Sequence, residues 1–427
     1  MIKKLHILTA VLGIVLESLA YGQDDDKANE SSDLEKVAEL LKDNAQLISL
    51  NSGTPSPKGE DEVEDETLSE DEVPLLEEEM KWKRYFDSDT RMLNICSERL
   101  GESDLSPLID FIVKNVGSLC LEDVDVEGVE KLMVGIMERA KLWKLCLRST
   151  YVRDDTVKAI AKLPLAELVL CDIMMRGDIV KAIAGDLLRN TALTSLDLSK
   201  NPITDKGAEE IIVALAGNTT LTSLGLSDIF ISNRSAEELS LSLMSNTTLT
   251  KLDLSLNCIT DDGADKIAEL LKLNSTLTSL NLSGGRGYCI NLGKIFESLL
   301  TNSTLTDLNL SGNRISVADA KMITEALAKN STLMSLNLSG GRGYCINLGE
   351  IFGFLRTNST LTDLNLSGNR ISVADAKMIT EALAKNSTLT SLNLRVDYPT
   401  PECEEALFQA LKENSTLTEL LYSDKKR

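Results

Sequence analysis

Leucines recur along most of this chain at one fixed interval, with polar positions between them in an equally fixed order. Nine leucines keep this interval without a slip: Leu193, Leu221, Leu249, Leu277, Leu305, Leu333, Leu361, Leu389 and Leu417. Each begins the pattern Leu-x-x-Leu-x-Leu, whose alternation of apolar and polar residues predicts a short strand with one buried face. A fixed period of this length is typical of a solenoid, in which each unit buries its apolar face against its neighbours.

Each unit also predicts a bend and a helix after its strand. In the first regular unit, Asn201 follows the strand, where its amide can bond backbone groups left open at the bend. Ile211, Ile212 and Leu215 then have helical spacing, and Asn218 is expected to end the helix. We therefore expect a parallel sheet on the concave side of the solenoid and helices on the convex side.

Two kinds of unit alternate. The bend asparagine occurs in every second unit, at Asn201, Asn257, Asn313 and Asn369, while the intervening units carry Ile229, Gly285, Gly341 and Asp397. The true repeat is therefore a pair of units, as in residues 193–248. Residues 277–332 and 333–388 differ at only five positions, so this tandem copy counts as evidence once.

Less regular versions of the motif precede the regular ones. They begin at Leu165, Leu142, Val116 and Thr90. We expect a solenoid over residues 90–427 with about twelve strands, of which residues 193–427 form the regular units. Degenerate end units are expected because they face water on one side. Trp82, Tyr85, Phe86 and Trp143 are expected to pack over the first coil.

The pattern Leu-x-x-Leu-x-Leu-x-x-Asn-x-Ile-x-x-x-Gly, with a helix that ends in Leu-x-x-Asn, resembles the ribonuclease-inhibitor-like class of leucine-rich repeats. The resemblance covers residues 90–427, most of the chain, and implies an α/β fold, a right-handed horseshoe with an inner parallel sheet and outer helices. Similar proteins include ribonuclease inhibitor, sensor regions of immune receptors, Ran GTPase-activating proteins and bacterial effectors. A shared fold does not select among their functions.

The first residues indicate export. Lys3 and Lys4 precede an apolar run, and Ala20-x-Gly22 offers a small-residue cleavage site, so residues 1–22 are expected to be a cleavable signal peptide of a secreted or exported protein. The alternative is an ordinary amphipathic N-terminus on a cytoplasmic protein. The apolar run is too short to span a membrane, and no membrane insertion is expected.

A strongly acidic segment follows over residues 23–89. Twelve of the twenty residues from Glu60 to Glu79 are acidic, and the formal charge of the whole chain is −22. Such a run repels itself and buries no core, which predicts a mostly disordered tail serving as a spacer or as an attractor for a basic partner. The acidity argues against nucleic acid and anionic membranes and favours a basic protein partner.

Candidate partner-binding residues lie in two places. The outward strand positions predict a smooth polar concave face with four carboxylates, at Asp197, Asp253, Asp307 and Asp363. The bends add arginine and tyrosine along one rim, at Arg286, Tyr288, Arg314, Arg342, Tyr344 and Arg370. Arginine and tyrosine on loops suit protein recognition. The alternative is that the concave residues are repeat filler and that the bend glycines only replace the asparagine turn.

The sequence offers little for catalysis. His6 is the only histidine, which excludes histidine-based acid–base chemistry, a histidine-activated nucleophile and histidine-ligated metal once residues 1–22 are removed. No Cys-x-x-Cys pair or phosphate-binding loop is present, so no catalytic, metal or cofactor residue is assigned. Cys120 and Cys146 occupy the same strand position in adjacent coils and are able to meet; free thiols are the default expectation.

These observations favour a non-enzymatic, monomeric protein-binding module that uses the concave face and the arginine- and tyrosine-bearing rim. Two alternatives remain open. One is a GTPase regulator that resembles Ran GTPase-activating proteins, although no catalytic-type residue can be carried over. The other is a structural or surface protein without a dedicated ligand.

Overall fold

The computed structural model describes residues 82–421, apart from 285–289, 291, 314, 341–350, 370–371 and 396–400. The expected signal peptide and the acidic segment up to residue 81 lie outside the described residues. Residues 82–89 are already part of the folded unit, since the Trp82 side chain is only 1 % exposed in the core. The solenoid therefore begins earlier than residue 90.

The strands form a single sheet in sequence order. They are β1 (Phe86–Asp87), β2 (Met92–Cys96), β3 (Ser118–Glu122), β4 (Lys144–Arg148), β5 (Glu167–Cys171), β6 (Ser195–Asp197), β7 (Ser223–Gly225), β8 (Lys251–Asp253), β9 (Ser279–Asn281), β10 (Asp307–Asn309), β11 (Ser335–Asn337), β12 (Asp363–Asn365), β13 (Ser391–Asn393) and β14 (Glu419–Leu421). Strand β1 pairs antiparallel with β2, and every later neighbour pairs parallel. The described residues form fourteen strands. The four irregular and nine regular motifs account for thirteen of them, one more than the predicted count of about twelve, and β1 adds one in front of them.

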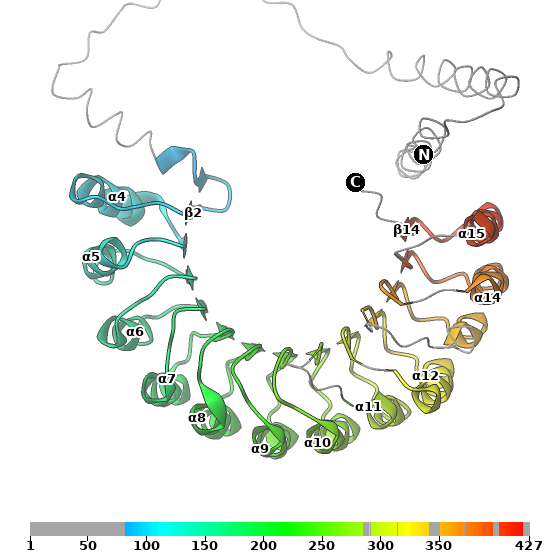
Figure 1. The fold of residues 1–427 in the computed structure, drawn as a ribbon. Helices are drawn as coiled ribbons and strands as arrows, with labels where there is room; N and C mark the ends of the chain where they lie inside the picture. The colour runs from blue at the N-terminus through cyan, green and yellow to red at the C-terminus, as the bar shows by residue number, and fades with distance from the viewer. Residues whose placement is uncertain are drawn as a thin grey trace, which may run out of the picture. The chain divides into compact units, whose positions relative to one another are not determined.

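Helices follow the strands on the outer side of the curved repeat region, while the sheet lines its inner side (Figure 1). They are α4 (Glu102–Asn115), α5 (Val126–Ile136), α6 (Asp154–Ile160), α7 (Gly177–Arg189), α8 (Thr204–Gly217), α9 (Asn233–Ser245), α10 (Asp261–Leu273), α11 (Leu292–Leu299), α12 (Val317–Lys329), the 3₁₀ helix η1 (Gly353–Arg356), α14 (Val373–Leu383) and α15 (Pro401–Glu413). This confirms the predicted solenoid with an inner parallel sheet and outer helices.

The core lies between the sheet and the helices and runs through every unit. The inward strand leucines are aligned in register, as with Leu308 and Leu336, and both are at most 1 % exposed. From the helix side, Ile211, Ile212 and Leu215 of α8 bury the face predicted from their spacing. Full burial of such a side chain contributes about 1.5–3 kcal/mol, so repetition of the same contact stabilises the stack.

A buried asparagine at each regular helix end ties one unit to the previous one. Asn246 shows the pattern: its Nδ2 donates to Leu215 O at 3.1 Å and to Asn218 O at 3.2 Å, and its Oδ1 accepts from Leu249 N at 2.8 Å. The equivalent residues are Asn218, Asn274, Asn302, Asn330, Asn358 and Asn386, which are all buried, and Asn414, which is half-buried. These asparagines satisfy backbone groups that the helix end leaves open.

The bend asparagines explain why only every second unit carries one. Nδ2 of Asn257 donates to Leu254 O in its own unit at 2.9 Å and to Leu226 O in the preceding unit at 2.8 Å. Its Oδ1 accepts from the backbone of the preceding bend, from Ile229 N at 3.1 Å and Ile231 N at 3.3 Å. One buried amide therefore serves two bends, and the intervening unit needs no asparagine of its own.

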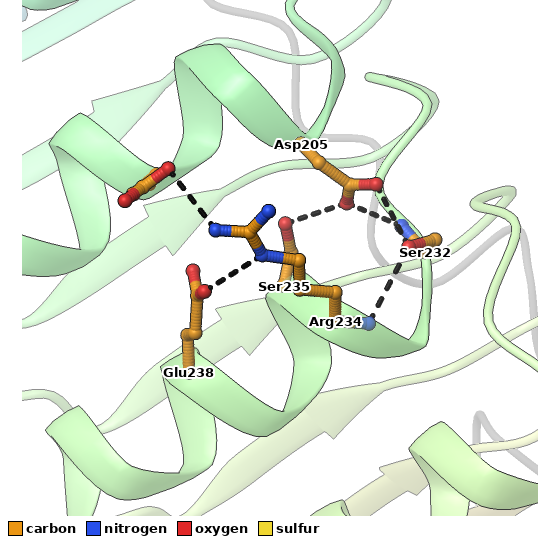
Figure 2. A network of polar contacts seen from close by, with 6 residues as sticks. Asp205, Ser232, Arg234, Ser235 and Glu238 are labelled. Carbon is orange, nitrogen blue, oxygen red and sulfur yellow. Dashed lines mark hydrogen bonds and ion pairs between the residues drawn. The ribbon is translucent and has the colours of Figure 1, made fainter.

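Several helix starts are capped from the preceding unit. Figure 2 shows Asp205 of α8 accepting hydrogen bonds at the start of α9, from Ser232 N at 2.8 Å, Ser232 Oγ at 2.7 Å and Ser235 Oγ at 2.6 Å. In the same way, Asn233 Oδ1 accepts from Thr260 N at the start of α10, at 2.8 Å. Burial by itself would raise the pKa of Asp205, but the hydrogen bonds from Ser235 and Ser232 outweigh it and the pKa is lowered.

The aromatic residues at the start of the solenoid do not all behave as expected. Trp82 is buried, and Phe86 packs edge-on against Phe111 with ring centroids 5.3 Å apart. Trp143 was expected to be in the core, and this is wrong: the residue is 45 % exposed. It precedes β4 at the point where the chain enters the sheet, so only part of its ring is covered, by the backbone of Gly117.

Candidate functional site

The outward side chains of the sheet form three parallel rows on the concave face, because residues of neighbouring strands are paired in register. The first row includes Ser195, Ser223, Lys251, Ser279, Asp307, Ser335, Asp363 and Ser391. The middle row includes Asp197, Gly225, Asp253, Asn281, Asn309, Asn337, Asn365 and Asn393. The third row consists of the residues two positions further on, which are serines from Ser199 to Ser367 and the exposed Arg395 after β13. We call these rows of β6–β13 the polar concave face.

The four predicted aspartates fall in two different rows. Asp197 and Asp253 belong to the middle row, two strands apart, whereas Asp307 and Asp363 belong to the first row and to strands nearer the C-terminus. Their places in the repeat give the same separation, since the first two lie four residues after the leucine that begins the unit and the last two lie two residues after it. The carboxylates therefore form two pairs along the sheet rather than one continuous line.

The middle-row pair is partly engaged within the protein. Asp197 Oδ1 accepts from Ser199 N at 3.0 Å. Asp253 Oδ1 accepts from Ser255 N at 2.8 Å, and its Oδ2 accepts from Asn281 Nδ2 at 3.0 Å. These bonds hold each carboxylate in place above its own strand, which prepares it to receive a ligand group without further ordering.

The first-row pair is less compensated. Both residues are exposed, yet loss of surrounding water on the concave face raises the pKa of Asp307, with repulsion from Asp363 adding to this effect and attraction to Lys251 opposing it. Among the residues that the structure describes, none of the four aspartates is within ion-pair distance of a basic side chain. A positive charge placed beside Asp307 and Asp363 would therefore stabilise their ionised forms.

A shallow hollow of about 500 Å³ lies over this face. Its lining extends from Lys144 and Glu167 to Asp307 and Asn309. Lys144 and Glu167 form an ion pair of 2.9 Å across β4 and β5. The lining has no aromatic side chain, and small polar residues predominate. It therefore resembles a contact surface more than an enclosed small-molecule site, which is usually apolar and concave.

The N-terminal end of the concave face carries thiols and a guanidinium in place of the hydroxyls and amides of the regular units. The outward positions predicted from the sequence covered only the regular units, so this difference was not predicted. Cys120 on β3 and Cys146 on β4 are register partners, as predicted, and both are free thiols. Arg148 Nε donates to Cys146 Sγ at 3.3 Å. The signal available in the sequence was the alternation in Leu145-Cys146-Leu147-Arg148, which places the thiol and the guanidinium on one face.

All six rim candidates lie outside the described residues: Arg286, Tyr288, Arg314, Arg342, Tyr344 and Arg370. Their contribution to a site therefore stays a prediction from sequence.

Within the described part of the chain, no three histidine, cysteine or acidic side chains gather in a way that could hold a metal ion. None of the helices described there combines the length and apolar character needed to cross a membrane.

Comparison with known proteins gives a family match. A sequence family described as "Leucine Rich repeat" matches residues 189–211, 245–268, 301–323 and 357–379. These four stretches begin at the same point of every second unit, so the match falls on the units with the bend asparagine. A search of curated protein sequences found no match.

Several solved structures are similar to this chain. An internalin from Listeria monocytogenes is 19 % identical, with 80 % of this chain and 88 % of that one covered and a TM-score of 0.43. The leucine-rich repeat-containing protein LegL7 from Legionella pneumophila is 22 % identical, with 63 % and 87 % covered and the same TM-score. Rad7 in its complex with Elc1 from yeast is 16 % identical, with 87 % and 94 % covered, again at 0.43.

Proposed function

Because this chain is a leucine-rich repeat protein, a class that generally mediates protein–protein interaction, we propose that it is a non-enzymatic binding module whose polar concave face holds a protein partner. The observation that carries this proposal is the register of the sheet. Eight parallel strands, β6–β13, present aligned rows of hydroxyl, amide and carboxylate groups to solvent on one continuous surface. Such a surface suits a partner that contributes many polar contacts rather than one deep anchor.

The charge of this surface points to the chemistry of the partner. Lys251 is the single basic residue in the first two rows of β6–β13, against Asp197, Asp253, Asp307 and Asp363. A partner that brings lysine or arginine would neutralise these carboxylates, and it would also remove the repulsion between Asp307 and Asp363. We therefore propose a basic protein surface as the ligand, with long-range attraction that is screened by salt.

Export is a separate part of the proposal. The lysines and apolar run of residues 1–22 support a cleavable signal peptide. The six cysteines that the structure describes as free support a final location that keeps thiols reduced. Intact-mass spectrometry of the protein from its native source tests this proposal: loss of about 22 residues in the fraction outside the cell supports export, whereas a full-length N-terminus in the cytosol contradicts it.

Site-specific photo-crosslinking in the native source tests the concave face. A photo-reactive residue replaces Ser223 on β7, and the control replaces Glu237 on the exposed side of α9. We expect Ser223 to crosslink a defined protein and Glu237 not to do so. Equal capture from both positions, or none from Ser223, would contradict the proposal.

The charge argument has its own test with the captured partner. The double variant Asp307→Asn/Asp363→Asn should bind about tenfold more weakly, and this loss should shrink as salt is added. The control is Asp262→Asn, which removes one acidic charge at the exposed start of α10. Equal weakening in both variants would show that net charge, and not the concave face, determines binding.

A further inference from the structure

Two thiols lie side by side at the N-terminal end of the concave face. Cys120 and Cys146 are directly opposite each other on the parallel strands β3 and β4. The leucines on either side of each cysteine are fully buried against the helices, so alternation turns both cysteines to the concave face of the sheet. Neighbouring strands are about 4.8 Å apart, and a disulfide needs Cα atoms about 4.4–6.8 Å apart. The strand spacing is therefore within the range of Cα separations that a disulfide can span.

The two thiols are chemically unequal. The pKa of Cys146 is lowered to about 7, chiefly by a hydrogen bond from Cys120, with burial opposing this effect and the Arg148 guanidinium supporting it. The pKa of Cys120 is raised, because its proton is shared with Cys146 and because the group is partly buried. At neutral pH, Cys146 thus carries much of the thiolate character, and Cys120 keeps its proton. A thiolate is the nucleophilic form of cysteine.

The neighbouring thiols show that position on the sheet alone does not produce this state. Cys171 is the register partner of Arg148 on β5, yet burial and the charge of Asp197 raise its pKa. Cys96 on β2 is exposed, and its pKa is raised by partial burial and by Glu122. The distinguishing feature of Cys146 is therefore the combination of a thiol donor on one side and the Arg148 Nε, at 3.3 Å, on the other.

We propose that Cys120 and Cys146 form a peroxide-responsive thiol pair, in which Cys146 is oxidised first and Cys120 then closes a reversible inter-strand disulfide. The Cys146 thiolate attacks one oxygen of hydrogen peroxide, the O–O bond breaks, and with one proton the products are a sulfenic acid and water. The Cys120 sulfur then attacks the Cys146 sulfur, and the S–OH oxygen leaves as water with the Cys120 proton. In total, two thiols lose two electrons and peroxide becomes two waters.

The burial of Cys146 decides which oxidant fits. The residue is only 4 % exposed, so a small molecule such as hydrogen peroxide can reach the sulfur more readily than a bulky disulfide. Reduction by a small thiol can begin at Cys120, which is less buried. This modification site does not depend on the protein-binding role proposed above, and its test does not require the partner.

Peptide mapping of the full chain tests the proposal. The reduced protein is treated with limiting hydrogen peroxide at pH 7, the remaining thiols are blocked, and the chain is digested with trypsin without reductant. Cys120 and Cys146 fall on separate tryptic peptides, residues 115–131 and 145–148. We expect these peptides to become linked before Cys96 or Cys171 is oxidised, and to separate with dithiothreitol. The proposal is overturned if the linked peptide does not form, or if the other cysteines react as fast.

Three variants separate the roles of the residues. Cys120→Ser should leave Cys146 as a sulfenic acid that dimedone traps; absence of the adduct would contradict the order of steps. Arg148→Gln should slow oxidation about tenfold at pH 7 and much less at pH 9, where the thiolate forms without help. If Arg148→Gln and the natural protein are oxidised at equal rates at both pH values, Arg148 does not assist the reaction. Cys258→Ser, on a distant bend, serves as the control, and thermal melts confirm that each variant is folded.

Discussion

Strands β2–β5 and strands β6–β13 belong to one sheet, yet they are built by two kinds of repeat. The N-terminal strands are five residues long, and the regular ones are three. Outward positions in the N-terminal group are mixed and include four cysteines, Arg148 and two glutamates, whereas those in the regular group are mostly serine, asparagine and aspartate. The core leucines are the same in both. The apolar pattern thus specifies the fold in both regions, and the outward positions are left to differ.

In the bends of the two regions, different side chains make the hydrogen bonds to the buried backbone groups. Thr150 follows β4 at the position that Asn201 takes after β6, and it is only 1 % exposed. Its Oγ1 donates to Arg148 O at 2.9 Å and accepts from Val124 N at 3.1 Å. A hydroxyl therefore replaces the amide, but with two hydrogen bonds, where Asn201 makes five.

Removing a bend amide or the Thr150 hydroxyl is expected to have the largest effect, and Asn257, which bonds two bends as Asn201 does, represents the amides. Asn257→Ala leaves backbone groups of two bends buried without partners, so we expect a loss of about 3–4 kcal/mol of unfolding free energy. Thr150→Ala affects fewer groups and should cost about 1–2 kcal/mol. Urea denaturation followed by circular dichroism measures both. Amide hydrogen exchange should show faster exchange at Ile229 and Ile231 in the Asn257 variant.

Asn257→Thr is the matched control for this difference. It places the threonine found in the N-terminal bend after β4 into a regular bend. The stability of this variant should lie between that of the natural protein and that of Asn257→Ala. If Asn257→Ala and Thr150→Ala are equally destabilised, the idea that one amide serves two units is wrong. Because long repeat arrays can depart from two-state unfolding, the local exchange rates decide between the readings.

The residue at the bend itself also differs between early and late units. Lys200, Asp228 and Leu256 adopt the left-handed backbone conformation, whereas glycine takes the same position at Gly312 and Gly368. A side chain in this conformation costs about 1–2 kcal/mol, except for glycine and, in part, asparagine and aspartate. The late units are thus relaxed at a point where the earlier ones are strained.

Exchanging these residues tests that contrast. Gly312→Ala should destabilise by about 2 kcal/mol, through the left-handed backbone and because a Cβ would lie 3.1 Å from Gly284 Cα. Leu256 is 44 % exposed, so Leu256→Gly loses little burial and should stabilise by about 1 kcal/mol. Thermal unfolding by differential scanning calorimetry measures both changes. Shifts of the same sign would show that the bends are not equivalent.

The spacing of leucines was enough to predict the sheet and the helices, since both follow from burying a repeated apolar face. The alternation of units was predicted from the bend asparagines. It did not explain why Ile229 could replace an asparagine. The hydrogen bonds from Ile229 N and Ile231 N to Asn257 come from a neighbour 26–28 residues away, and only coordinates show that one amide reaches both bends.

The candidate site was predictable to a lesser degree. Alternation and the constant repeat length placed Asp197, Asp253, Asp307 and Asp363 on the concave face at two different repeat positions. They did not predict the surroundings of each carboxylate, because contacts such as that between Asn281 and Asp253 join side chains of neighbouring strands. The contact between Arg148 and Cys146 was missed for a related reason. Alternation places the two side chains on one face, but whether the guanidinium reaches the thiol depends on the side-chain conformations.

Capping from the preceding unit is one device that the two regions share, and it gives the smallest predicted effect. In the N-terminal region, Glu130 Oε1 accepts from Arg153 N at 2.7 Å at the start of α6, as Asp205 does from Ser232 N at the start of α9. Loss of one such cap typically costs about 1 kcal/mol. We therefore expect Asp205→Asn to lower the unfolding free energy by about 1 kcal/mol at pH 7.

The pH dependence of this loss distinguishes a charged cap from simple packing. Because the pKa of Asp205 is lower in the folded state than in the unfolded state, its stabilisation is present above about pH 4 and is lost as the pH falls through the folded value. The difference between the natural protein and Asp205→Asn should therefore narrow as denaturation is repeated from pH 7 towards pH 3. Asn233→Ala removes an uncharged cap, from Thr260 N, and its cost should stay constant over the same range. A constant difference for Asp205→Asn as well would mean that the ionised carboxylate is not what ties α9 to the unit before it.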